Sequence, residues 1–446
     1  MRQRTNWRII MIKIIKYPAI VQNHARVFKN IFINKAQYKH FKEYLTGLML
    51  CENKTVMGIQ SNYVNAGSIN SLDHFMIHAQ WSEKEINDKR ILDLQKRIDT
   101  VSKPEGVISI DDTLTHKTGK HMDDAEFHFD HSIRQYILGH NIVSTHYKDR
   151  KVSYPLDYRQ YYRKPTPKKL QQEYKKIDKQ INLFHVKQYF IEKLKLLLDY
   201  QHRLQRFKTK IELAIELIHK AEAMGINAKV YVFDSWFLCK EIAKIISSYG
   251  KDWISVLKSN RNLMIKNEKI SVSEYIKRIP KSSYRQIKTN TGRLYWVFTK
   301  VVHVCSLGKV RLVISYDNKS LKGDPTVLAT NRKEWEPVKI ISTYELRWSI
   351  DAFYRDAKQH LGLEAYQLRN AKGIKRHWYF VFLAYTFLML NVQNSKLLRR
   401  IKANIATIGE SSRALADEVT LSLILWVYKN FRNNKPVEEV LQCLLN

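Results

Sequence analysis

Residues 344–358 read YELRWSIDAFYRDAK, and this stretch combines an apolar face with an unusual polar one. At about 100° per residue, Tyr344, Arg347, Asp351 and Lys358 fall within roughly 60° of one another on a helix. A second stripe, roughly 100° away, is apolar and typical of a helix that packs on a core. Its members are Leu346, Ile350, Phe353, Ala357 and Leu361. The stretch therefore predicts one amphipathic helix that carries a phenol, a guanidinium, a carboxylate and an amine beside its buried face.

The composition favours a nucleic-acid partner. The 446 residues include 76 Lys and Arg against 42 Asp and Glu, a formal net charge of +34. Such an excess opposes compaction by self-repulsion unless a polyanion neutralises it. The four cysteines lie far apart without a CxxC pair, which is typical of a reducing compartment and argues against a zinc ribbon. The longest apolar stretch, WYFVFLAYTFLML (378–390), is too short to span a bilayer comfortably and predicts a buried core helix.

The pattern along the chain predicts an α/β fold. The first hundred residues look helical and basic, which favours a DNA-binding region, with a plain helical cap as the alternative. A strand pattern follows at 106–113, and residues 141–162 have the pattern of a hairpin. A proline-broken basic loop (163–169) and helices (about 185–224) come next, followed by buried strands at 229–236 and 253–258. Residues 265–330 alternate polar and apolar side chains as an antiparallel β insertion does.

We therefore expect a mixed sheet with helices, interrupted by that insertion, in five parts. They are an N-terminal helical DNA-binding region (1–100), the first part of a catalytic core (101–264), the insertion (265–330), the last core helices (331–395) and a C-terminal helical tail (396–446).

Three carboxylates stand out as candidate metal ligands. Asp112 and Asp234 end apolar strands, and Asp351 lies beside an apolar helix face, where a lone charge is costly to bury. Phosphodiester chemistry often uses two divalent ions about 3.5–4 Å apart, held by carboxylate oxygens. Each acid could instead have a purely structural role. Asp112 could be a loop acid, Asp234 a turn or capping residue, and Asp351 an i,i+4 partner of a helix arginine.

A histidine-rich segment offers a rival site. Residues 116–132 contain His116, His121, His128 and His131 among four acids, but their spacing matches neither HExxH nor a CxxC…HxxxH pattern. We interpret this segment as a solvated loop. The sequence also lacks the GxxxxGK[ST] phosphate loop of ATP-driven motors and the GxSxG motif of acyl transfer.

The helix of the opening quotation resembles the Tyr-x2-Arg-x3-Glu-x6-Lys motif of prokaryotic insertion-sequence transposases of the DDE class. Tyr344, Arg347 and Lys358 match position for position. IDDT (110–113), FDSW (233–236), KQHLGLEAYQLR (358–369) and the insertion ahead of the last helix are also similar, so the resemblance covers roughly residues 105–390.

The resemblance implies a ribonuclease-H-like catalytic domain and assigns roles to residues. Asp112, Asp234 and Asp351 would be the catalytic acids and hold Mg²⁺ (or Mn²⁺), as two ions. Asp111 stays open as the first acid, because adjacent strand residues face opposite sides; Asp112 is preferred because the similar motif places the acid directly before Thr. Among the DNA-binding residues, Arg347 and Lys358 would hold phosphates and Tyr344 would hydrogen-bond one.

The aromatic residues near the motif have two readings. Trp348 would stack on a displaced base, or it could be a packed core indole. Trp296, in the insertion, is a second stacking candidate.

One residue departs from the motif. The third acid is usually Glu, and this chain has Asp351. The side chain is shorter by about 1.5 Å, one bond length, and a misplacement of about that size can cost a hundredfold in rate. Either the helix sits closer to the metal ions or this copy is impaired.

The resulting expectation is a cut-and-paste transposase that cleaves at the terminal inverted repeats of its own element and transfers the freed 3′ ends to target DNA. Double-stranded DNA would be its partner, and it would act as a homodimer, in the prokaryotic cytoplasm and at the nucleoid, with no membrane contact. Whether a hairpin intermediate forms is left open. The alternatives are an inactive protein that only binds the element ends, and another ribonuclease-H-like nuclease.

Overall fold

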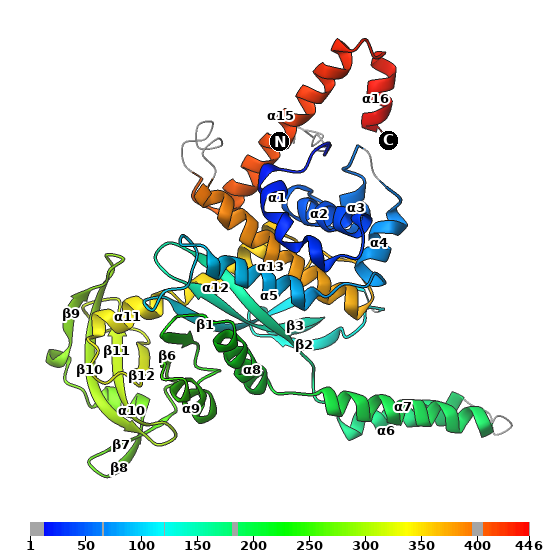
Figure 1. Cartoon of the computed structure of the whole chain (residues 1–446). Helices are drawn as coiled ribbons and strands as arrows, with labels where there is room; N and C mark the ends of the chain where they lie inside the picture. Colours follow the sequence, from blue (N-terminus) through cyan, green and yellow to red (C-terminus); the bar gives the residue numbers. More distant parts are fainter. Residues whose placement is uncertain (1–12, 65–66, 120, 181–185, 395–404, 446) are drawn as a thin grey trace, which may run out of the picture.

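The computed structural model describes residues 13–64, 67–119, 121–180, 186–394 and 405–445, and its centre is a mixed β-sheet (Figure 1). Five strands form the core in the order β4–β3–β1–β5–β6; β4, β3 and β1 are antiparallel, and β1, β5 and β6 are parallel. Their bounds are β1 Val107–His116, β3 Gln135–Lys148, β4 Ser153–Tyr161, β5 Val230–Phe233 and β6 Asp252–Val256. Three antiparallel strands followed by two parallel ones form the ribonuclease-H-like arrangement, so the expected fold class is confirmed.

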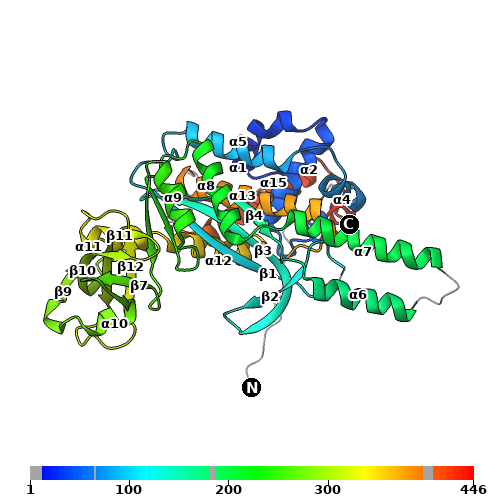
Figure 2. The same ribbon diagram turned by 90° about the horizontal axis from the view of Figure 1, so that it is seen from below.

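Helices cover both faces of this core sheet (Figures 1 and 2). On one face, α8 (Lys210–Ala223) packs on β3 and β4 and contacts α9 (Lys240–Ser248). On the other face lie α12 (Trp348–His360) and α13 (Ala371–Asn394), with α5 (Glu83–Lys96) packed on α13. The two faces of β1 therefore meet different helices, which determines what each side chain of that strand contacts.

The insertion continues the same sheet. Its last strand, β12 (Thr326–Thr330), pairs with β6 of the core, and β11, β10, β7 and β8 follow outward. The other elements are β7 Asn262–Ile265, β8 Glu268–Ser271, α10 Val272–Lys277, β9 Arg285–Lys288, β10 Leu294–Val304 and β11 Gly308–Tyr316. With β2 (Glu126–Asp130) on the opposite edge, one sheet of 12 strands runs through the molecule.

The N-terminal helices share one hydrophobic core with α13 and the sheet. They are α1 Ala19–His24, η1 Ala25–Ile31, α2 Lys35–Leu50, α3 Val56–Gln60 and α4 Ile69–Ile77, and α1, α2 and α4 pack on α13 together with α5. The apolar run 378–390 lies within α13 and is buried throughout, which confirms the core helix expected there. Arg376, fully buried on α13, donates hydrogen bonds to four backbone carbonyls between Phe75 and Trp81.

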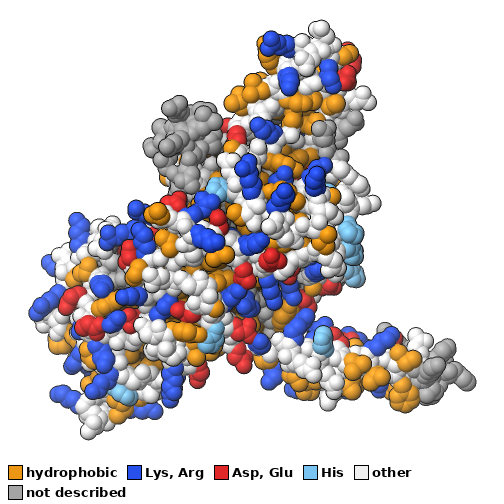
Figure 3. Space-filling view, viewed as in Figure 1, with side chains coloured by type: hydrophobic (Ala, Val, Ile, Leu, Met, Phe, Trp, Pro, Cys, Tyr) orange, Lys and Arg blue, Asp and Glu red, His pale blue; other side chains and the backbone are white. Residues whose placement is uncertain are grey.

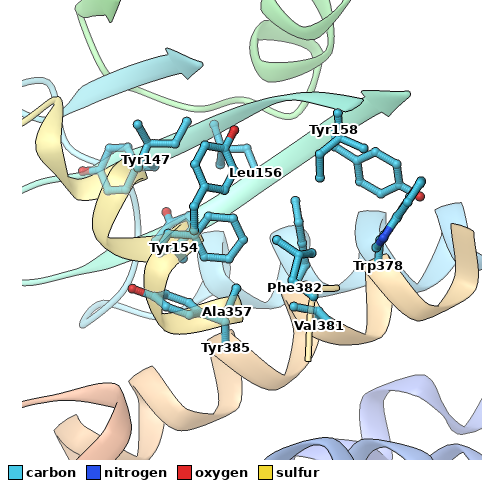
Figure 4. Close-up of a cluster of buried hydrophobic side chains, with 14 of the residues drawn as sticks. Tyr147, Tyr154, Leu156, Tyr158, Ala357, Trp378, Val381, Phe382 and Tyr385 are labelled. Atoms are coloured by element: carbon cyan, nitrogen blue, oxygen red, sulfur yellow. The ribbon is translucent and has the colours of Figure 1, made fainter. Parts of the chain in front are cut away.

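The core between the sheet and α13 is rich in aromatic side chains (Figure 4). Tyr158 of β4 contacts Trp378 and Phe382 of α13 edge to face, with ring centroids 5.4 and 5.5 Å apart. Phe353 of α12 meets Phe382 in the same geometry at 5.2 Å. Buried aromatic pairs of this kind contribute about 0.5–1.5 kcal/mol each beyond their area, so α12 is firmly seated on the sheet.

Three local expectations were wrong. The stretch 344–358 is not one helix: α11 (Pro337–Glu345) ends before Leu346, and α12 begins at Trp348 after a turn with i→i+3 hydrogen bonds. The expected loop 163–169 ends early, because α6 (Pro167–Gln180) starts at a proline, which suits the first helical turn. The histidine-rich segment is not a loop throughout, since β2 pairs with β3 within it.

Two helical arms extend from the body (Figure 1). One is formed by α6 and α7 (Val186–Arg206), and the other by α15 (Ile408–Arg432) and α16 (Val437–Leu445). Both present exposed apolar side chains, visible in Figure 3 among Lys and Arg side chains spread over this face. The described helices include none that is long and apolar enough to cross a membrane.

Buried histidines predict acid sensitivity of the fold. Burial lowers the pKa of His377 to about 3, although the Gly362 carbonyl that it contacts opposes the shift, and burial lowers the pKa of His146 as well. Since the unfolded chain binds these protons near pH 6.5, protonation favours unfolding as the pH falls below that value. We expect the free energy of unfolding, measured with urea, to fall between pH 7.5 and 5.5 by about 1 kcal/mol for each such histidine. His377→Gln should reduce this difference, and the exposed control His303→Gln should leave it unchanged.

Candidate active site

The parallel pairing of β1 and β5 brings two acids to the same level of the sheet. Ile110 of β1 pairs with Phe233, the last residue of β5. Asp111, in the middle of β1, and Asp234, directly after β5, are the next residues along the chain, so they lie at the same level. The alternation of a strand then decides which member of the Asp111–Asp112 doublet faces which helix.

Asp111 faces α12. Its cross-strand partner is Ser144, whose hydroxyl is 2.7 Å from the Tyr354 hydroxyl of α12. The Tyr354 hydroxyl donates to the Asp111 carbonyl at 3.0 Å. Tyr354 therefore fixes α12 to the middle of β1 beside the Asp111 carboxylate.

Arg347 lies between Asp111 and Asp351. Its Nη1 is 3.0 Å from Asp111 Oδ2 and 3.2 Å from Asp351 Oδ2. The guanidinium is buried, with 8% of its side chain exposed, whereas Asp351 is 42% exposed. One buried cation thus neutralises two carboxylates that come from β1 and α12.

Asp234 combines a turn role with a place in this cluster. Its Oδ1 accepts the backbone N–H groups of Trp236 and Phe237 at 3.0 and 3.3 Å, which is the turn-capping role considered above. Its negative charge nevertheless raises the pKa of both Asp111 and Asp351. Asp234 is therefore close enough to both carboxylates to act on their pKa, after the larger effect of burial.

Asp112 lies on the opposite face of β1. Lys210 Nζ, at the start of α8, donates to Asp112 Oδ2 at 2.7 Å, and Asn141 Nδ2 donates to the same oxygen at 2.9 Å. This geometry favours Asp111 over Asp112 as the first acid. Strand alternation turns Asp112 toward α8 and Asp111 toward α12.

Two of these carboxyl groups, Asp111 and Asp351, have raised pKa values. Burial and the charge of Asp112 raise the pKa of Asp111 to about 7, and Arg347 opposes that shift. Burial raises the pKa of Asp351, again opposed by Arg347. Raised carboxyl pKa values are expected where like charges share a buried site, and they mark a place where additional positive charge would be stabilising.

The other residues of the motif lie around this cluster. Tyr344 is buried at the end of α11, and burial raises its pKa to about 12, so it keeps its proton. Trp348 is 58% exposed, which rules out the packed-core reading, and the Arg347 guanidinium lies 4.6 Å from its ring centre. Lys358 donates to the Leu114 carbonyl at 2.8 Å and lies 3.5 Å from Glu364, so its ammonium already has protein partners.

Two residues that the sequence did not single out belong to the surroundings of the site. Trp236 is 45% exposed two residues after Asp234, and Lys210 Nζ lies 5.3 Å from its ring centre. The motif FDSW contained the signal for Trp236. Lys210 carried none, because only the packing of α8 brings it to β1. Trp296, by contrast, lies partly buried on β10 of the insertion, paired with Gln286 and Tyr316.

The donor chemistry of the cluster fits a hard divalent cation. Three carboxylates from three elements supply oxygen ligands, and Asp351 Oδ2 is buried without a well-formed hydrogen bond. As the described residues stand, no three His, Cys, Asp or Glu side chains lie close enough together to hold a metal ion, and this applies to Asp111, Asp234 and Asp351 as well as to the histidines of 116–132. In this structure the guanidinium of Arg347 occupies the position between the acids.

Comparison with known proteins identifies relatives of the chain. Residues 27–280 match the family described as "DDE superfamily endonuclease", and residues 173–399 match the family described as "Archaeal putative transposase ISC1217". A stretch of 117 residues is 26% identical to "Putative transposase y4zB" of Sinorhizobium fredii (strain NBRC 101917 / NGR234), covering 25% of this chain. The match spans 33% of that relative's length.

The two neighbouring acids should respond oppositely to neutralisation. Because the folded-state pKa of Asp111, about 7, is above its ordinary value, its ionisation favours the unfolded state increasingly as the pH rises toward 7. We expect Asp111→Asn to raise the free energy of unfolding in EDTA by about 1–2 kcal/mol at pH 8, and by less at pH 5. Asp112→Asn should lower it by about 0.5–1 kcal/mol, since the Lys210 pair is lost. Urea denaturation at both pH values measures this, and equal effects of the two substitutions would contradict the assignment of faces.

Proposed function

The chain belongs to the insertion-sequence transposases of the DDE class, and from this premise we propose that it moves its element by a cut-and-paste reaction. It would cleave DNA at the terminal inverted repeats of that element and join the freed 3′ ends to target DNA. The observation that supports this proposal is that Arg347 bridges Asp111 of β1 and Asp351 of α12, with Asp234 following β5 at the level of Asp111.

We assign the metal site to these three acids, with Asp111 in place of Asp112. Asp111, Asp234 and Asp351 would hold Mg²⁺ or Mn²⁺, as two ions in the sense of the two-metal nucleases. Ions held there would supply activation of a water or 3′ hydroxyl nucleophile and positive charge beside the phosphate. Asp112 would act indirectly, by fixing Lys210 and by adding negative charge behind Asp111.

The remaining residues would position the DNA and balance the charge. Arg347 limits repulsion between Asp111 and Asp351. Tyr344, protonated at neutral pH, can donate a hydrogen bond to a phosphate oxygen. Trp348 presents an exposed indole face beside the acids, suited to stacking on a base. Lys358 would serve mainly by holding α12 to β1 through the Leu114 carbonyl.

The partners follow from the same premise. We propose double-stranded DNA as substrate, both as element ends and as target, and a homodimer that holds two ends together. The basic N-terminal helices and the C-terminal arm would contribute to end recognition and pairing. The net charge of +34 supports binding to a polyanion.

Strand cleavage tests the proposal. The substrate is a labelled duplex that carries the end of the DNA flanking the gene, with Mg²⁺ or Mn²⁺ added. We expect nicking by the wild-type protein, a loss of at least about a thousandfold in Asp234→Ala and Asp111→Asn, and no more than about a tenfold loss in Asp112→Asn.

The alternatives predict other outcomes of this assay. If the wild type and Asp234→Ala bind the duplex equally and neither cuts it, the protein only binds element ends. If cutting does not depend on the flanking inverted repeat, the protein is another ribonuclease-H-like nuclease. Loss of activity in Asp112→Asn with full activity in Asp111→Asn would reverse the choice between the two acids.

The length of the third acid can be tested separately. Asp351 is 42% exposed at the start of α12, which leaves room for one more methylene. We expect Asp351→Ala to abolish nicking and Asp351→Glu to stay within about tenfold of the wild type. A gain of a hundredfold in Asp351→Glu would instead show that the shorter side chain impairs this copy.

A further inference from the structure

A basic hollow lies beside α12, at the end of the helix remote from the three acids. Its volume is about 460 Å³, and Tyr385 and Met389 of α13 contribute apolar lining. Its cationic lining comes from the end of β3, the turn after it, α12 and α15. These side chains are Lys148, Lys151, Arg355 and Arg413, and the imidazole of His360 lies among them. Elements far apart in sequence thus direct cations into one cavity.

The positive charge of this hollow is only partly neutralised. Asp356 is the one carboxylate of its lining, and it lies 3.2 Å from Arg355. Within the described part of the chain, neither Lys148 nor Arg413 forms an ion pair with a carboxylate. Burial lowers the pKa of Lys148, with Asp149 opposing the shift. A half-buried ammonium that loses hydration is stabilised by an anion placed beside it.

The attraction for an anion comes from side chains and not from the start of α15. The backbone N–H groups of Ala406 and Thr407 donate to the Glu410 carboxylate, so these amides are already satisfied. Gly409 has a structural role here: a Cβ at this position would lie 2.9 Å from His360 Nε2. The missing side chain lets α15 begin against the end of α12 and form one wall of the hollow.

The hollow and the acids share α12 as a common support. Asp351 and Trp348 lie in its first turn, Arg355 follows one turn later, and His360 ends it. At about 1.5 Å per residue, the hollow extends along the helix from roughly 6 Å (Arg355) to roughly 13 Å (His360) beyond Asp351. Since one strand of a duplex advances about 3.4 Å per nucleotide, these distances equal roughly two to four nucleotides.

We propose that this hollow binds a backbone phosphate of the DNA strand that lies over α12. Arg413 and Lys148 would contact the phosphate oxygens, Arg as a planar fork and Lys as a point charge. The position of this phosphate relative to the cleaved bond rests on the proposed function. The inference that the hollow binds a phosphate rests on the residues that line it.

The salt dependence of DNA binding tests this inference. The double variant Lys148→Gln/Arg413→Gln is compared with Lys319→Gln/Lys322→Gln, which removes the same charge from the exposed loop between β11 and β12. Binding of a fluorescein-labelled duplex of 40 base pairs is followed by anisotropy in EDTA between 50 and 200 mM NaCl. We expect the slope of log K against log salt to become shallower by about 0.9 in the first variant, the value for one lost phosphate contact, and to change much less in the control.

Further variants and ligands distinguish the possible results. Arg413→Lys should keep most of the slope, and thermal unfolding verifies that each variant is folded. An equal change in both double variants, or none in either, would overturn the inference. So would stabilisation by inorganic phosphate that depends on Arg413 while the DNA slope stays unchanged, because the hollow would then take a free anion.

The experiment is independent of the nicking assay. It is carried out without divalent ions, so it requires no cleavage. Absent nicking together with the expected change in slope would remove the proposed reaction and leave the phosphate site. Normal nicking with an unchanged slope would remove the phosphate site alone.

Discussion

The guanidinium of Arg347 joins the two parts of the chain on which the candidate site depends. Asp111 lies in the middle of β1 and Asp351 in the first turn of α12, 240 residues later in the numbering, and Nη1 of Arg347 lies within 3.2 Å of both. Two carboxylates that face each other across a buried gap repel unless a cation lies between them. The position of α12 on the sheet, and with it the shape of the site, follows from this neutralisation and from the Tyr354 contact to β1.

The sheet defines the rest of the site through register and alternation. Parallel pairing of β1 and β5 places Asp111 and Asp234 at one level, and the pleat turns Asp112 toward α8. The two neighbouring acids thus have different partners: Asp111 contacts Arg347, and Asp112 binds Lys210 on the other face of the strand. A change of one residue in the register would exchange these two environments.

The use of α12 extends beyond the acids. The helix carries Trp348 beside the acids and Arg355 and His360 at the basic hollow, so one rigid element would orient a DNA strand over roughly 13 Å. Rigid support matters because a misplacement of about 1 Å can cost a hundredfold in rate. The contact of Phe353 with Phe382 and the packing of α13 on the N-terminal helices supply that support.

The sequence alone determined the fold class and the buried helix at 378–390, and it singled out Asp234 and Asp351 as candidate acids, because apolar periodicity and motif spacing are local properties. The choice between Asp111 and Asp112 depended on which helix covers each face of β1, and that is a property of packing. The break between α11 and α12, the protein partners of Lys358 and the place of Lys210 were likewise decided only by tertiary contacts. Such contacts join residues that are distant along the chain, so no local pattern records them.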